Sequence, residues 1–327
     1  MAGPAPGAGP EWSGGDRVQP PVGHNRPVAP LTRFAPAPTG YLHLGHVVNV
    51  LQVWRAAAAR GGRVLLRIED HDRQRCRPQF EAALLDDLDW LGFVPDVFPT
   101  DVFRAGACEG RQSDRDAVYH RAVAELARAG LVYGCRCTRR DIDRASTGGD
   151  VEAVTVPAGS AELRYPATCR DLGLPLDADH GWRVRLPDDT VAFDDLRHGA
   201  TVQTPAAQCG DLLLRDRLGN WTYQFAVVVD DMAQGIDLVV RGDDLFASTG
   251  RQILLARLLG RDAPPTFLHH ALVMKSATQK LSKSDGDTGV RALRAAGWSP
   301  ARVRAEAARL IGAASLAVTD PATIEPR

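Results

Sequence analysis

The chain of 327 residues is long enough for one large α/β domain with an insertion, or for two small domains. It contains no apolar run of about 18 residues, so neither a transmembrane helix nor membrane contact is expected, and its net charge of −1 gives no global attraction to nucleic acid. Six cysteines without an export signal favour a reducing, cytoplasmic setting and metal binding over disulfides.

Residues 1–30 are rich in Pro, Gly and Ala and predict a disordered tail. The stretch from Arg33 to Asp70 then predicts a strand, a turn, a helix and a second strand. The Pro-x-Pro-Thr-Gly sequence at 36–40 cannot lie inside a helix, and the apolar run after His46 has helical length and ends at two glycines. Such a βαβ unit places helix N-terminal N–H groups beside a turn, where they favour a phosphate.

Two histidines, His43 and His46, lie at the mouth of this predicted helix with Gly45 between them. Both imidazoles can donate hydrogen bonds to developing charge on a phosphoryl group, and the glycine allows close approach of the backbone. Two solvated surface histidines are the alternative. The turn before them and the Glu69-Asp70 pair at the end of the next strand favour the phosphate site.

Apolar residues at helical spacing predict helices over 78–91 and from Ser113 to Gly130. The segment 133–215 consists mostly of short strands and loops and is predicted to be an inserted small domain. An apolar strand is then expected from Trp221 to Asp231, ending on carboxylates at a sheet edge. Four further elements are expected: strands at 182–186, 190–193 and 236–240, and a helix over about 251–259 capped by Ser248 or Thr249.

The only lysines of the chain, Lys275, Lys280 and Lys283, fall within one short segment, whereas every other basic side chain apart from histidine is arginine. A compact ammonium approaches phosphate oxygens more closely than the broad guanidinium does. The cluster therefore predicts a phosphate-binding loop, with chance clustering as the alternative.

His43-Leu-Gly-His46, followed far downstream by Lys280-Leu-Ser-Lys283-Ser, resembles the two signatures of class I aminoacyl-tRNA synthetases. The strings Arg33-Phe-Ala-Pro-Ala-Pro-Thr-Gly and Arg67-Ile-Glu-Asp resemble the glutamate-specific branch of that class. The resemblance implies an α/β fold with a Rossmann-like parallel sheet and an inserted zinc-binding domain. It also implies activation of glutamate by ATP and Mg²⁺ to glutamyl-adenylate, followed by transfer to a nucleic-acid hydroxyl.

The resemblance further implies a domain organisation. It comprises the tail (1–30), the first half of a nucleotide-binding catalytic domain (31–132), an inserted zinc-binding, acceptor-like domain (133–215), the second catalytic half (216–270), and the lysine loop with a basic helical C-terminus (271–327).

Site residues follow from the resemblance position by position. Catalysis is assigned to His43, His46 and Lys283. The ATP-binding residues are expected to be Pro36, Thr39, Gly40, His43, Gly45, His46, Lys280, Ser282 and Lys283. The glutamate-binding residues are expected to be Arg33, Phe34, Ala35, Pro36, Ala37, Glu69, Tyr223 and Arg241. A guanidinium can bind the side-chain carboxylate of glutamate, and Glu69 can hold its ammonium. The alternative is that the two arginines merely pair with Glu69, Asp243 or Asp244.

Cys135-x-Cys137 and Tyr165-x-x-x-Cys169 offer three thiolates and one phenolate, enough for a tetrahedral site with one Zn²⁺ per chain. The pattern resembles the zinc site of glutamyl-Q tRNA(Asp) synthetases, which are short paralogues of glutamyl-tRNA synthetases. Because tyrosine is an uncommon zinc ligand, His180 or water remains an alternative fourth ligand.

Three functions are compatible with these features: glutamylation of queuosine in the anticodon of tRNA-Asp, charging of tRNA-Glu, and RNA or partner binding without activity. The intact signatures argue against the third. Only about 40 residues follow Ser284, too few for the large anticodon-binding domain of the glutamate branch, which favours the first. A monomer is expected, with phosphate contacts from Arg139, Arg140, Arg144, Arg294 and Arg302.

Overall fold

The computed structural model describes residues 29–147, 163–273 and 289–316. The predicted ATP-site residues Lys280, Ser282 and Lys283, together with Lys275, lie outside the described residues. So do residues 1–28 of the predicted tail.

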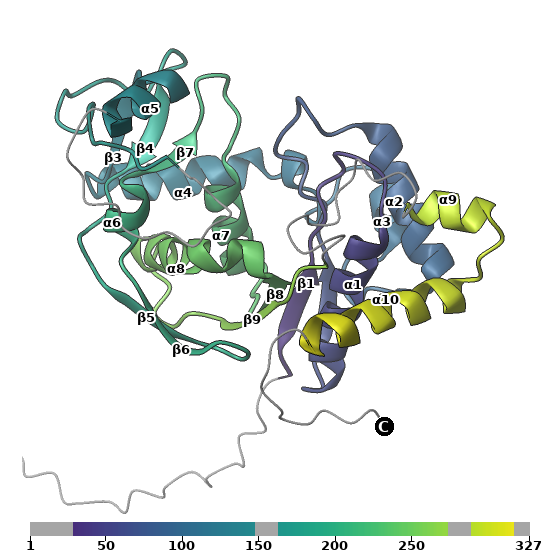
Figure 1. Cartoon of the computed structure of the whole chain (residues 1–327). Helices are drawn as coiled ribbons and strands as arrows, with labels where there is room; N and C mark the ends of the chain where they lie inside the picture. The colour runs from purple at the N-terminus through teal and green to yellow at the C-terminus, as the bar shows by residue number, and fades with distance from the viewer. Residues whose placement is uncertain (1–28, 148–162, 274–288, 317–327) are drawn as a thin grey trace, which may run out of the picture.

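A six-stranded sheet forms the centre of the molecule, in the order β2-β1-β8-β9-β5-β6 (Figure 1). All neighbouring strands are parallel except the β5–β6 hairpin, which confirms an α/β fold with a mainly parallel sheet. The strands are β1 (Leu31–Phe34), β2 (Arg63–Leu66), β5 (Val191–Asp195), β6 (Gly199–Gln203), β8 (Leu238–Gly242) and β9 (Thr266–His270).

A second, antiparallel sheet in the order β3-β4-β7 comprises β3 (Val132–Cys135), β4 (Gly181–Val184) and β7 (Leu212–Arg215). The predicted insertion thus contributes to both sheets, because β5 and β6 extend the central one. Two of the strands expected within it, at 182–186 and 190–193, are confirmed as β4 and β5 with slightly shifted ends.

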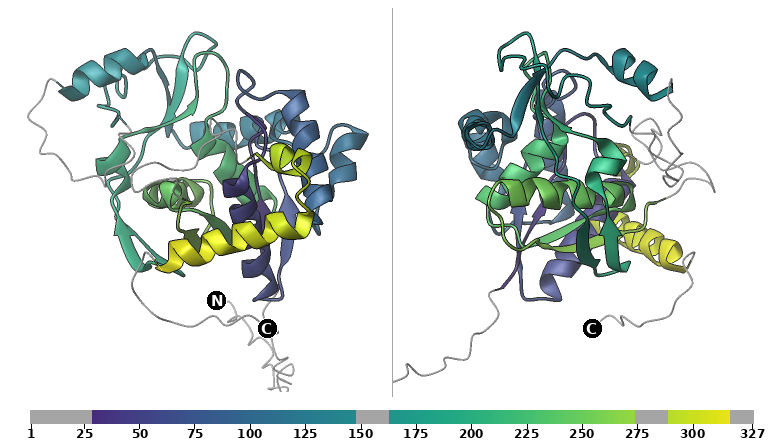
Figure 2. Two further views of the ribbon diagram at one scale, coloured as in Figure 1. Left: turned by 45° about the vertical axis from the view of Figure 1, so that its right-hand side comes forward. Right: turned by 90° about the vertical axis from the view of Figure 1, so that its left-hand side faces the viewer.

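Helices cover both faces of the central sheet, and alternate residues along a strand pack into two different hydrophobic cores. Val64 and Leu66 pack with α1, α2 and α10, whereas Leu65 packs with α4, α7 and α8. Helix α10 lies across α1 in the ribbon views of the whole chain (Figures 1 and 2). The helices are α1 (Leu44–Ala58), α2 (Pro78–Leu91), α3 (Thr100–Ala105), α4 (Asp116–Arg128), α5 (Arg139–Thr147), α6 (Pro205–Cys209), α7 (Tyr223–Ala233), α8 (Thr249–Leu258), α9 (Val290–Ala295) and α10 (Pro300–Leu316).

The strand predicted from Trp221 to Asp231 is wrong, because this segment forms the helix α7. Its β-branched run, Val227 to Val229, favours a strand locally, and every residue from Phe225 to Asp231 is buried. A helix buried all round shows no polar face, so periodicity does not distinguish it from a buried strand. No helix in the described parts of the chain is long and apolar enough to cross a membrane.

Candidate active site

The two histidines form the N-terminal cap of α1. His43 has extended backbone at the cap position, and its Nδ1 accepts the Gly45 N–H at 3.1 Å. The Nδ1 of His46 in turn accepts the His43 N–H at 3.1 Å, and the two ring centroids are 3.9 Å apart. Since Nδ1 accepts in both rings, each neutral imidazole carries its proton on Nε2. The helix N-terminus therefore presents two imidazole donors beside its own N–H groups, as a phosphate requires.

The first described residues after the lysine segment also contact this turn. Gly289, the first described residue after that segment, forms a β-bridge with His43. The Val290 N–H donates to the Leu42 carbonyl at 2.9 Å. Gly289 and Val290 are therefore joined to the His43 turn by backbone contacts.

The turn after β1 is also fixed to the segment after β2. The Glu69 N–H donates to the Pro36 carbonyl at 3.0 Å, which brings Glu69 to the turn. The Phe34 ring instead lies in the core, with its centroid 6.1 Å from that of Trp54, so only its backbone can line a ligand site. The other predicted residues of the turn are half-buried: Ala35, Ala37, Thr39 and Gly40.

A buried network of opposite charges joins Arg33 to Glu69. The Arg67 guanidinium, which is fully buried, donates to Asp231 Oδ1 at 2.8 Å and to Glu69 Oε1 at 3.1 Å. The Nε of Arg33 donates to the same Asp231 oxygen at 3.0 Å. Burial works against a charged Asp231, but the two guanidinium groups hold its pKa below the usual value. Arg33 thus has an acidic partner, although not one of those considered from the sequence.

Arg241 is held differently, by neutral acceptors alone. Its Nε donates to His269 Nε2 at 2.9 Å, and its terminal nitrogens donate to Gln252 Oε1 at 2.6 Å and Thr249 Oγ1 at 2.9 Å. Among the described residues, no carboxylate forms an ion pair with this buried guanidinium, so it pairs with neither Asp243 nor Asp244. Burial lowers the pKa of Arg241. A buried cation without an acidic partner favours an anionic ligand.

Tyr223 begins α7 next to these charges. Burial and the negative charge of Glu69 raise the pKa of its phenol, whereas the positive charges of Arg241 and Arg33 act in the opposite direction. The hydroxyl is therefore neutral and lies in the same electrostatic environment as the predicted glutamate-binding residues. Arg33 and Arg241 lie on the adjacent strands β1 and β8, where the Arg33 guanidinium donates to the Val240 carbonyl at 3.3 Å.

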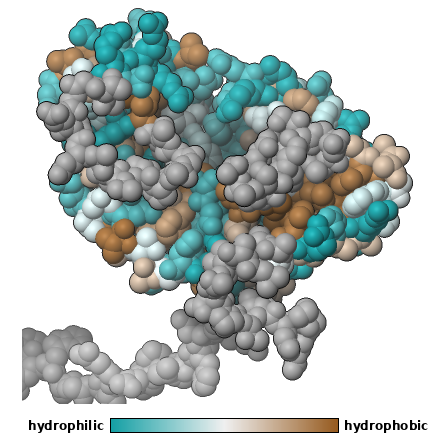
Figure 3. Space-filling model, viewed as in Figure 1, coloured by the Kyte–Doolittle hydropathy of each residue, from teal (hydrophilic) through white to brown (hydrophobic). Residues whose placement is uncertain are grey.

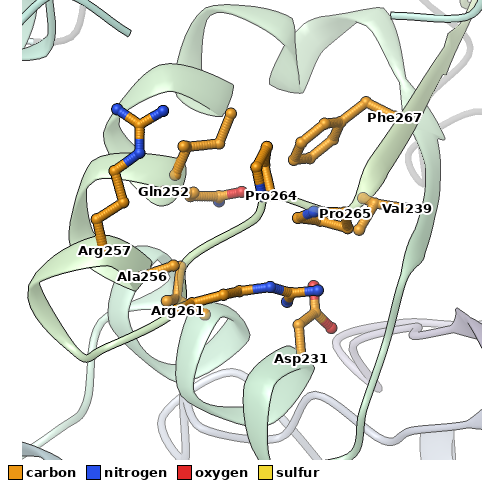
Figure 4. Close-up of a pocket in the computed structure, with 11 residues that line it drawn as sticks. Asp231, Val239, Gln252, Ala256, Arg257, Arg261, Pro264, Pro265 and Phe267 are labelled. Atoms are coloured by element: carbon orange, nitrogen blue, oxygen red, sulfur yellow. The ribbon is translucent and has the colours of Figure 1, made fainter. Parts of the chain in front are cut away.

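A separate small pocket lies between α7, α8 and the sheet (Figure 4). In this view the Asp231 carboxylate and the Arg261 guanidinium point toward one another, beside Pro264, Pro265 and Phe267. Its volume of about 30 Å³ suits a water molecule and excludes an amino acid or a nucleotide.

Three cysteine thiols converge in the small antiparallel sheet. The Sγ atoms of Cys135, Cys137 and Cys169 all lie within 4.8 Å of one another. The Tyr165 hydroxyl lies 3.4 Å from Cys135 Sγ, so a fourth donor reaches the same point. His180, the alternative ligand, instead pairs with Asp177 at 2.6 Å. The donor set matches what a closed tetrahedral zinc site requires.

Arg183 on β4 contacts two members of this cluster. Its Nε donates to Cys135 Sγ at 3.3 Å, and its guanidinium carbon lies 3.7 Å from the Tyr165 ring centroid. The side chain is buried, and within the described ranges no carboxylate pairs with it. A buried cation that donates to the Cys135 sulfur is the arrangement expected where that sulfur is anionic.

Sequence patterns missed several residues of both sites. Asp231 and His269 are far along the chain from Arg33 and Arg241, Arg67 entered only as part of the Arg67-Ile-Glu-Asp string, and no local motif marks Arg183 as a neighbour of the cysteines. For Asp231 the sequence did give a signal, because the apolar run that ends on two acidic residues was expected at a sheet edge, although as a strand.

Comparison with known proteins gives a consistent picture. Residues 30–315 match the family model of class I tRNA synthetases (E and Q), catalytic domain. A glutamyl-Q tRNA(Asp) synthetase of Rhodobacter capsulatus is 41% identical over 294 residues, which cover 86% of this chain and 99% of that protein. One of Ralstonia nicotianae is 43% identical over 283 residues, covering 86% and 84%.

A solved structure, the glutamate tRNA ligase of Elizabethkingia meningosepticum with its amino acid, superposes with a TM-score of 0.64 at 30% identity. The match covers 79% of this chain and 53% of that one, so the chain spans about half the length of this solved relative.

Proposed function

The chain belongs to the class I tRNA synthetases of the glutamate and glutamine type, and we propose that it activates glutamate with ATP and transfers the glutamyl group to queuosine of tRNA-Asp. The similarity to glutamyl-Q tRNA(Asp) synthetases along nearly their full length supports this acceptor. The proposal makes the chain a ligase that modifies an anticodon base.

The observation that carries glutamate activation is the position of Arg241. Its buried guanidinium, without an acidic partner among the described residues, lies on the strand next to β1, and β1 leads into the His43–His46 turn. An anionic amino-acid side chain and a nucleotide phosphate are therefore recognised at the carboxyl ends of neighbouring parallel strands. Ligands of open α/β sheets bind at this edge.

We assign the glutamate contacts by charge. Arg241 binds the side-chain carboxylate, with the neutral hydroxyl of Tyr223 beside it. Glu69 holds the substrate ammonium, while its own position is fixed by Arg67 at 3.1 Å. Arg33 is already paired with Asp231. It therefore adds positive charge to the electrostatic field of the pocket and orients the Asp231 carboxylate.

In the activation step, an α-carboxylate oxygen of glutamate attacks the α-phosphorus of ATP, and the bond to the leaving pyrophosphate breaks. The Nε2 donors of His43 and His46 and the α1 N-terminus stabilise the charge that develops on the phosphate oxygens. Lys283 is assigned to the leaving pyrophosphate, and Mg²⁺ bound with ATP would supply further charge neutralisation. A hydroxyl of the acceptor then attacks the acyl carbon, and AMP leaves.

We further propose that Cys135, Cys137, Cys169 and Tyr165 hold one Zn²⁺ and that Arg183 offsets part of the negative charge of this ligand set. The metal would be structural, because four protein donors leave no open position. The convergence of the four donor atoms within a small buried cluster supports this assignment.

RNA contacts are proposed on helix α5, which packs against the cysteine cluster. Arg139, Arg140 and Arg144 are exposed on α5, where hydrophilic side chains cover the surface at the upper left of Figure 3. Exposed arginines of this kind bind phosphates in a salt-dependent manner.

ATP–pyrophosphate exchange tests the activation step directly. We expect exchange with glutamate in the absence of tRNA, and no exchange with glutamine or aspartate, because neither places a carboxylate at the guanidinium of Arg241. Equal exchange with glutamine would contradict the assignment of Arg241.

A further inference from the structure

We propose that Asp195 and His269 form a positioning pair that holds Arg241 through a neutral acceptor and thereby maintains the preference of the site for an acidic side chain. This inference rests on the proposed function, since Arg241 is assigned there to the glutamate carboxylate. Neither residue touches the substrate in this account, so both are positioning residues.

The sheet register brings the pair to Arg241. Arg241 on β8 and His269 on β9 are register partners of neighbouring parallel strands, and their side chains meet at 2.9 Å. Asp195 ends β5, the next strand, and its Oδ2 lies 2.7 Å from His269 Nδ1. The three side chains thus form a line across three adjacent strands.

The hydrogen bonds fix the tautomer of the imidazole. Asp195 accepts four N–H groups: the backbone N–H of His269, its ring Nδ1–H, and the backbone N–H groups of Arg197 and His198. These bonds hold the pKa of Asp195 below its usual value although burial opposes this. A charged Asp195 requires the proton of His269 on Nδ1, which leaves Nε2 as the acceptor that Arg241 needs.

The neutrality of this acceptor matters for specificity. The His269 and Asp195 side chains are both fully buried, and burial lowers the pKa of His269, so the ring is uncharged at pH 7. Arg33 and Arg67, by contrast, donate directly to carboxylates. A carboxylate in the position of His269 would offset the charge of Arg241, whereas an imidazole orients the guanidinium and leaves its charge for the ligand.

Two amide variants separate the two ends of the imidazole. In His269→Gln the side-chain oxygen takes the place of Nε2 and still accepts from Arg241. In His269→Asn the amide nitrogen takes the place of Nδ1, so the contact to Asp195 remains and the acceptor for Arg241 is lost. Glutamine is close to histidine in volume, whereas asparagine is one methylene smaller, so the KM for ATP serves as the control for the volume lost in His269→Asn.

The measurement is the KM for glutamate and for ATP in pyrophosphate exchange, with Arg241→Gln as the reference. We expect His269→Asn to raise the KM for glutamate about 10-fold, the usual loss for a hydrogen bond to a charged group, and to leave the KM for ATP unchanged. His269→Gln should stay within about 2-fold of the wild type. Equal KM values for glutamate in both variants would overturn the inference.

The Arg241→Gln variant distinguishes a failure of the proposed role of Arg241 from a failure of the positioning role of His269. If Arg241→Gln leaves the KM for glutamate unchanged, the proposed role of Arg241 fails. If Arg241→Gln raises it strongly while both His269 variants resemble the wild type, only the positioning role fails.

A second measurement uses the wild-type protein and therefore does not depend on the folding of a variant. In wild-type protein labelled with ¹⁵N-histidine, long-range ¹H–¹⁵N correlation spectra at pH 7 distinguish Nδ1–H from Nε2–H tautomers. A neutral ring with the proton on Nδ1 is expected for His269. A spectrum without any neutral Nδ1–H ring would overturn the inference.

Discussion

Replacing Cys137 with serine should release the metal from the small sheet. Zinc–sulfur bonds of about 2.3 Å place the ligand atoms of a tetrahedron about 3.8 Å apart. The Cys137 and Cys169 sulfurs are 3.5 Å apart, and Cys135 Sγ and the Tyr165 hydroxyl are 3.4 Å apart. The four donors therefore already lie at the spacing of one ion, and each contributes to a shared site.

The magnitude follows from the ligand count. Structural zinc sites bind with about 10–16 kcal/mol, so the loss of one of four ligands removes about 3 kcal/mol, or about 100-fold in affinity. A neutral serine hydroxyl does not replace a thiolate. The buried core of the β3-β4-β7 sheet around this site is small (Tyr133, Cys135, Tyr165 and Cys169), so loss of zinc should also lower the unfolding temperature.

The assay is metal analysis of purified protein after dialysis against a weak chelator. About one zinc per chain is expected in the wild type and well below one in Cys137→Ser. Cys108→Ser is the matched control, because this half-buried thiol lies outside the cluster. Full zinc content in Cys137→Ser would refute the ligand set.

Three further changes test other parts of the account. Lys283→Ala should lower glutamate-dependent exchange by about 10²-fold, the loss expected for one charge stabiliser, and exchange at the wild-type rate would remove Lys283 from the phosphate site. Arg183→Gln should speed zinc release to a chelator whereas Arg185→Gln should not, because only Arg183 donates to Cys135; equal release rates would contradict this. Burial raises the pKa of Asp87 from 3.8 to about 6, so the folded state loses about 3 kcal/mol as pH rises through this interval. Asp87→Asn should accordingly raise the melting temperature at pH 7.5 and not at pH 3.5, and an equal gain at both would show that the charge is not the cause.

Local signals in the sequence were sufficient for the phosphate turn. Proline and glycine mark the ends of α1, and the short spacing of His43 and His46 places both on its first turn whatever the rest of the chain does. The α/β class and the helix α8 followed from similar signals, as did the presence of four donors for the metal.

Contacts between distant elements were not accessible in the same way. Asp231 reaches Arg33 across 198 residues, and the helix that carries it was predicted as a strand because Val227–Val229 favour one locally. His269 meets Arg241 only through the register of β8 and β9. These positions are set by tertiary packing, which overrides local propensity.

The acceptor is the central claim, and one measurement tests it most directly. Purified protein, labelled glutamate and ATP are incubated with tRNA-Asp from queuosine-replete cells, tRNA-Asp from queuosine-deficient cells, and tRNA-Glu. We expect label on queuosine-bearing tRNA-Asp alone. Equal labelling of both tRNA-Asp samples, or a preference for tRNA-Glu, would contradict it.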